Sequence, residues 1–206
     1  MEQDTQDKLK QIKASFRLQM NGVASQSMRD KGLGYKINWG IGLPLLKFIA
    51  KEYGKDYNLA IELWKENIRE CKILATMIMP PSEMEPDIVD LWISQIPNQE
   101  IAEMLAFNLF QYLDDAKNYA LRWLAADKVN EVICGYNVLA RLFAKNVEFS
   151  EREINEFIDQ AQATLSDENV SVRHSVVNAL TRFGQMDGGH NKILKSAFKS
   201  YDLDIF

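Results

Sequence analysis

The sequence predicts an all-α protein with the α-α superhelix of a HEAT- or armadillo-like repeat solenoid, and three observations lead to this fold class. Apolar residues recur three or four positions apart along nearly the whole chain, whereas the alternation typical of strands is almost absent. Turn-forming residues divide this pattern into roughly ten to twelve segments of helical length. Equivalent positions then recur at intervals of 31, 34 and 40 residues, the range expected of two-helix repeats.

The first half of the chain contains clear helix boundaries. Pro44 suits the first turn of a helix, where its missing N–H costs nothing, and Gly54 suits the left-handed position that follows a helix end. Two apolar stripes follow, on Tyr57, Ala60, Ile61 and Trp64 and then on Ile68, Cys71, Leu74 and Ala75. Pro80-Pro81 and Pro97-Asn98 interrupt the chain, because proline disfavours a helical residue before it.

The second half continues the helical pattern. Three stripes mark successive helices: Ala102, Leu105, Ala106, Leu109 and Leu113; Val129, Val132, Ile133, Tyr136, Ala140 and Phe143; and Ile154, Phe157, Ile158, Ala161 and Leu165. Ser150-Glu151-Arg152-Glu153 has the spacing of a capping box and predicts a helix start at about residue 151. Gly184 is expected just past the end of a later helix.

Internal similarity favours a repeat array over a globular bundle. The form of the second half of a HEAT repeat is matched by Asp167-x-x-Val170-x-Val172-Arg173-x-x-Val176-x-x-Ala179-Leu180. A helix pair cannot bury its apolar side alone, so pairs must stack, and the curvature of the stack creates a concave face suited to an extended partner. Because no Ser-, Gly- or Pro-rich linker divides the chain, we expect one domain over residues 1–206.

The composition excludes several classes of protein. Cys71 and Cys134 lie in apolar stretches and are expected to be buried thiols of a cytoplasmic protein, without a disulfide framework. His174 and His190 lack neighbours at ligand spacing, so we expect no metal site, and without a glycine-rich phosphate loop we expect no cofactor. No apolar run approaches the 18 or so residues of a membrane span, and the start Met1-Glu2-Gln3-Asp4 is unlike a signal peptide.

The net charge of -5 is unevenly distributed. Residues 1–72 carry 13 basic and 9 acidic side chains (+4), residues 73–172 carry 6 and 17 (-11), and residues 173–206 carry 5 and 3 (+2). These charges are explained either by solvated helix faces or by a basic face that converges on folding. Charge alone therefore does not identify the partner.

Two segments carry a resemblance to a known family. The segment Tyr35-Lys36-Ile37-Asn38-Trp39-Gly40-Ile41-Gly42-Leu43-Pro44-Leu45-Leu46-Lys47 resembles the opening of the first repeats in the AlkD-like DNA alkylation repair family. The segment Leu63-Trp64-Lys65-Glu66-Asn67-Ile68-Arg69-Glu70, followed by Leu74-Ala75, resembles that family's next helix junction. The resemblance covers about residues 10–200. It implies a curved HEAT-repeat protein that holds duplex DNA through backbone contacts, and whose active members release N3- and N7-alkylated purines.

The same resemblance identifies a candidate catalytic acid and three departures. Glu103 matches the position of the family's catalytic aspartate, where a carboxylate stabilises positive charge that develops on the sugar. Gln99 and Asn178 stand where the family has tryptophans, and Ile133 corresponds to its arginine. These departures weigh against alkylpurine glycosylase activity. The alternative interpretation of Glu103 is an ordinary acid on a solvent- or groove-facing helix surface.

Basic residues near the repeat junctions are the candidate DNA contacts: Lys47, Lys128, Arg173, Arg182, Lys192 and Lys195. Arg173 and Arg182 are nine residues apart on one helix, so they point in opposite directions, and Arg173 also suits hydrogen bonds within its own repeat. The four tryptophans favour core packing over base stacking. The competing function is a non-catalytic HEAT-repeat scaffold whose acidic middle section recruits a basic protein.

Overall fold

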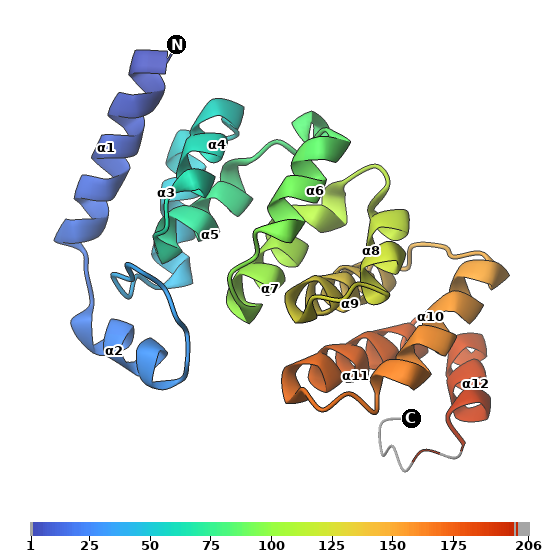
Figure 1. The fold of residues 1–206 in the computed structure, drawn as a ribbon. Helices are drawn as coiled ribbons and strands as arrows, with labels where there is room; N and C mark the ends of the chain where they lie inside the picture. The colour runs from blue at the N-terminus through green and yellow to red at the C-terminus, as the bar shows by residue number, and fades with distance from the viewer. Residues whose placement is uncertain (1, 200, 202–206) are drawn as a thin grey trace. The chain divides into compact units, whose positions relative to one another are not determined.

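The computed structural model describes residues 2–199 and 201, and in these residues it contains twelve α-helices, two short 3-10 helices and no strand (Figure 1). The all-α prediction and the expected number of helices are confirmed for this part of the chain. Contacts group the chain into two compact units, Met1–Asp90 and Leu91–Phe206. None of the described helices combines the length and the apolar character that crossing a membrane requires. The single-domain expectation stays a prediction.

The first unit contains five complete α-helices. They are α1 (Glu2–Leu18), α2 (Gly22–Asp30), α3 (Leu43–Tyr53), α4 (Tyr57–Lys65) and α5 (Arg69–Ile78). The 3-10 helix η1 (Pro81–Glu83) follows, and α6 (Pro86–Ser94) begins at the end of the unit. Helix α5 packs against α3 and α4, and α4 also contacts α1. Pro44 and Gly54 lie at the start and the end of α3, as predicted.

A buried charged pair fixes the loop before α3. Both oxygens of the Glu70 carboxylate accept backbone N–H groups of this loop, from Trp39 at 3.2 Å and from Ile41 at 3.2 Å. The Arg69 guanidinium donates to the Ile41 carbonyl at 2.9 Å and lies 3.3 Å from Glu70. Gly40 lies between Trp39 and Ile41 in this loop and has a φ of 73°. A Cβ at Gly40 would lie 2.2 Å from the backbone oxygen of Asn21, the N-cap residue of α2, so only glycine fits there. Arg69 and Glu70 therefore hold in place the loop that carries much of the family resemblance.

The second unit contains the remaining helices. They are α7 (Gln99–Asn108), η2 (Phe110–Tyr112), α8 (Ala116–Leu124), α9 (Val129–Ala144), α10 (Glu151–Thr164), α11 (Val170–Gly184) and α12 (Gly188–Ala197). Helix α9 packs between α7 and α11, and these three helices form one layer (Figure 1). Helix α8 covers the other side of α9, and α10 contacts α8 and α11. A Cβ on Gly135 would lie 2.9 Å from the Ala120 carbonyl, so glycine permits the close approach of α8 and α9.

Most predicted boundaries of the second unit are confirmed. Ser150 and Glu153 form the capping box at the start of α10, and Asn98 caps α7 by accepting the N–H of Ile101. The expectation for Gly184 was wrong, because it is the last residue of α11 and is absent from the left-handed glycines. Of the tryptophans, Trp64, Trp92 and Trp123 are buried and Trp39 is half-buried, as expected for core packing.

The two cysteines should be unreactive in the folded protein. Both side chains are buried, and burial raises the pKa of each thiol above its ordinary value. Because the thiolate is the reactive form, we expect neither to react with Ellman's reagent in native buffer at mildly alkaline pH, and both to react in concentrated urea. Rapid native labelling of either cysteine would contradict this burial.

Candidate nucleic-acid interface

A groove runs along the exposed side of the α7–α9–α11 layer in the second unit. It consists of two adjoining hollows of about 270 Å³ and 140 Å³. We call it the α9 groove and define it by six side chains: Glu103 and Phe107 of α7, Asn137 and Arg141 of α9, and Asn178 and Arg182 of α11. The smaller hollow shares Glu103, Asn137 and Asn178 and adds Gln99 and His174.

Each helix contributes a polar residue and, four positions later, an aromatic or cationic one. Four residues make about one helical turn, so the two members of each pair lie on the same helix face. Only the larger hollow contains Phe107, Arg141 and Arg182, while both contain Glu103 and the asparagines. The groove therefore has a polar end and a cationic end.

The sequence of α9 dictates which of its side chains reach the groove. From Val132 to Phe143 every residue is buried except Asn137 and Arg141. Helix α9 is central to the unit, packed against α7, α8 and α11, so its apolar side chains fill those contacts. Asn137 and Arg141 take the single face that remains.

Glu103 is a half-buried carboxylate in the shared part of the groove. Its Oε1 accepts a hydrogen bond of 2.7 Å from Nε2 of Gln99, one turn earlier on α7. Within the described residues it forms no ion pair with a lysine, arginine or histidine. Its negative charge is thus held in place but not neutralised, as an acid in either a binding or a catalytic role requires.

The cationic end carries charge without acidic partners. The Arg141 guanidinium lies 4.8 Å from the centre of the Phe107 ring, and the Lys145 ammonium lies 4.0 Å from that of Tyr112. Nε of Arg141 is buried without a hydrogen-bond partner. Partial burial, together with the neighbouring Arg141, lowers the pKa of Lys145. Across the described chain, neither residue forms a salt bridge with a carboxylate.

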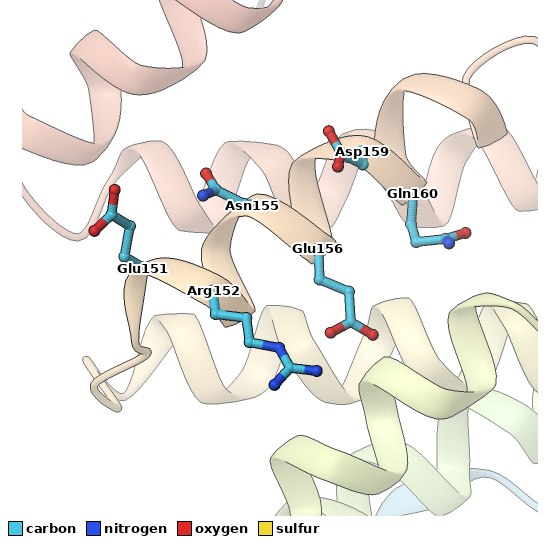
Figure 2. Close-up of a pocket in the computed structure, with 6 residues that line it drawn as sticks. All are labelled: Glu151, Arg152, Asn155, Glu156, Asp159 and Gln160. Atoms are coloured by element: carbon cyan, nitrogen blue, oxygen red, sulfur yellow. The ribbon is translucent and has the colours of Figure 1, made fainter.

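A separate hollow lies along α10, and its charge is opposite to that of the cationic end of the groove. Figure 2 shows the side chains that line it: Glu151, Arg152, Asn155, Glu156, Asp159 and Gln160. Three carboxylates and one guanidinium give this surface a net negative charge, which repels a polyanion. None of the predicted site residues lies there. Its exposed charges make it a suitable control surface.

The groove brings together only two of the predicted site residues, Glu103 and Arg182. Lys128 donates to the Ser94 carbonyl and pairs with Glu131, and Arg173 donates to loop carbonyls at Asp167 and Glu168. Arg173 and Arg182 thus point to different places, as their spacing predicted. The others lie elsewhere, with Lys47 on α3 of the first unit and Lys192 and Lys195 exposed on α12. No group of three or more His, Cys, Asp or Glu side chains in the described chain could hold a metal ion.

One predicted correspondence lies outside the groove. Ile133, aligned with an arginine of the resembling family, is only 1% exposed and belongs to the core. The α9 residues that lie beside Glu103 in the groove are Asn137 and, one turn on, Arg141. Arg141 was missed, although with Asn137 it is one of two strongly polar residues in the apolar run from 132 to 143. That four-residue spacing was the signal that could have found it.

Comparison with known proteins decides the family. A model of the family described as DNA alkylation repair enzyme matches residues 12–192. The chain belongs to the DNA alkylation repair enzyme family. No curated protein matched the chain.

The fold of this DNA alkylation repair family member is similar to that of a solved structure. That structure is described as a new family of proteins related to the HEAT-like repeat DNA glycosylases with affinity for branched DNA structures. It matches with a TM-score of 0.83 at 18% sequence identity, over 92% of this chain and 81% of that one. The predicted HEAT-like α-α fold is therefore confirmed. In this family member, Gln99 and Asn178 line the groove beside Glu103.

Proposed function

We propose that this protein binds DNA through backbone phosphates at the cationic end of the α9 groove, and that it prefers branched DNA to linear duplex. The observation that supports the proposal is the presence of Arg141 and Arg182 in the groove, and of Lys145 directly after α9, without carboxylate partners in the described chain. The family match and the branched-DNA affinity stated for the similar structure agree with it.

Repulsion between Arg141 and Lys145 destabilises the folded protein slightly. Arg141 of α9 and Lys145, the residue that follows α9, are four residues apart, a spacing at which like charges repel. A bound phosphate would relieve this repulsion and accept hydrogen bonds from the terminal guanidinium nitrogens of Arg141. The unbound groove therefore has the electrostatic character of an anion site, although the whole chain is acidic.

The other candidate contacts are a secondary part of the proposal. Lys192 and Lys195 are exposed on α12, so their side chains are accessible to a phosphate, and Lys47 lies on the surface of α3 in the other unit. Lys128 and Arg173 would first have to leave their present hydrogen bonds. We expect these two to contribute less than Arg182.

Base excision is the second candidate activity, and it rests on the half-buried, unneutralised Glu103. The surrounding Gln99 and Asn178 are amides, which lack the aromatic faces that attract a cationic base. We therefore expect binding without release of 7-methylguanine from methylated DNA, measured by chromatography of the freed base. If release does occur, Glu103→Gln should abolish it, and persistence in that variant would contradict the assignment of Glu103.

A salt titration tests DNA binding. We expect a fluorescein-labelled four-way junction to bind more tightly than a duplex of the same length, and both to dissociate steeply as salt rises, because phosphate contacts release counterions. Absence of binding at low salt would reject the proposal. That result would favour the protein-binding scaffold, for which the acidic α10 surface in Figure 2 is the suited face.

A further inference from the structure

Phosphate binding does not explain why the polar end of the groove contains a carboxylate. The inference drawn from this carboxylate rests on the proposed function. Glu103 lies in the same groove as Arg141 and Arg182. An ionised carboxylate only accepts hydrogen bonds and repels phosphate. The part of a bound DNA that faces Glu103 must therefore present donors, and in DNA these are the N–H groups of the bases.

The lining of the smaller hollow suits the edge of a base. Gln99 donates to Glu103 and Asn137 donates to the Ile133 carbonyl, and the remaining amide groups of these two residues and of Asn178 line the hollow. The hollow is small, about 140 Å³, and a base whose Watson–Crick edge is already paired has no free edge donor for Glu103. A base can enter only when it is unpaired, and branch points and bulges supply such bases.

The two ends of the groove are close enough for one nucleotide to contact both. Asn137 and Arg141, like Asn178 and Arg182, are separated by one helical turn, about 5.4 Å along the axis. The long arginine side chains extend this reach toward the phosphate of a base held beside Glu103. A base beside Glu103 would thus place its phosphate within reach of Arg141 and Arg182.

We propose that the α9 groove binds one unpaired nucleotide, with guanine as the preferred base. The N1–H and the exocyclic amino group of guanine point the same way and can both donate to the Glu103 carboxylate. Thymine presents a single N–H between two carbonyl oxygens, which the carboxylate repels. Arg141 and Arg182 hold the phosphate of either nucleotide and do not discriminate between them.

The test compares duplexes that contain a single bulged guanine or a single bulged thymine, by fluorescence anisotropy at one salt concentration. We expect the bulged guanine to bind about tenfold more tightly, the scale of one bidentate contact to a base. Glu103→Gln should reduce the preference below about twofold. Arg141→Ala should weaken both duplexes equally. Glu156→Gln, the same change on the exposed α10 surface, should leave the preference intact.

A second variant keeps the carboxylate and blocks the hollow. Asn178→Leu fills the polar end with an apolar side chain and should remove the same preference, with the helical content checked by circular dichroism. Equal affinity for the two bulges, or a preference that survives Glu103→Gln, would overturn the unpaired-base site while salt-dependent binding remained. Absence of binding to every DNA would instead overturn the proposed function itself.

Discussion

Replacing Glu70 with alanine should lower the free energy of unfolding by about 3–5 kcal/mol, the range observed when one member of a buried ion pair is removed. The substitution leaves the Arg69 guanidinium, only 3% exposed, without its carboxylate neighbour. It also removes the acceptor of two backbone N–H groups, those of Trp39 and Ile41. Because unpaired buried polar groups are costly, the loop before α3 should detach.

Urea unfolding followed by circular dichroism measures this effect. Glu52→Ala is the matched control, since Glu52 is an exposed acid of α3 in the same unit, and we expect it to change stability by less than about 0.5 kcal/mol. Glu70→Gln keeps a side-chain acceptor and should fall between the two. Equal unfolding midpoints for Glu70→Ala and Glu52→Ala would show that the contacts of Glu70 do not stabilise the folded protein.

Removing both guanidinium groups of the α9 groove should weaken binding of a four-way junction by at least about 100-fold. Each charge-assisted hydrogen bond to a phosphate contributes about 1.5–3 kcal/mol, so two lost contacts account for this loss. The double variant Arg141→Ala, Arg182→Ala should still fold, because Arg182 is exposed and Arg141 lies at the edge of the core. Anisotropy titrations at fixed salt provide the measurement.

Arg152→Ala controls for a change in overall charge. Arg152 is an exposed arginine of α10 in the same unit, among carboxylates on the surface shown in Figure 2. We expect its loss to change junction affinity less than about twofold, since a distant exposed charge is screened by salt. A loss as large as that of the double variant would show that binding follows net charge and not the groove.

The helices were predictable because their signals are local. The capping box at Ser150, the prolines and the apolar stripes each act within one or two turns of the chain, so periodicity found the elements. Gly184 was misplaced because glycine also occurs inside helices, and its sequence does not reveal its φ. The hydrogen bond from the Trp39 N–H to the Glu70 carboxylate joins residues that are 31 positions apart, and no local sequence pattern predicts such a contact.

The groove was less predictable than the helices. Glu103 came from a family resemblance, and Arg182 from its place near a repeat junction, but Arg141 was passed over in a helix dominated by apolar residues. Which basic residues are available depends on their neighbours in space. Lys128 is engaged by Glu131 and a carbonyl, whereas Lys145 lies on the Tyr112 ring. The packing of the helices determines which carboxylates, carbonyls and rings contact each lysine, and amino-acid composition does not predict these contacts.

The salt dependence of junction binding tests most directly whether the α9 groove holds DNA phosphates. The slope of log K against log salt counts the counterions released, and each lost phosphate contact reduces its magnitude by about one. The Arg141→Ala, Arg182→Ala variant should therefore show a slope shallower by at least about one than that of the unmodified protein. Identical slopes would contradict the proposal, because the phosphates would then be bound elsewhere on the protein.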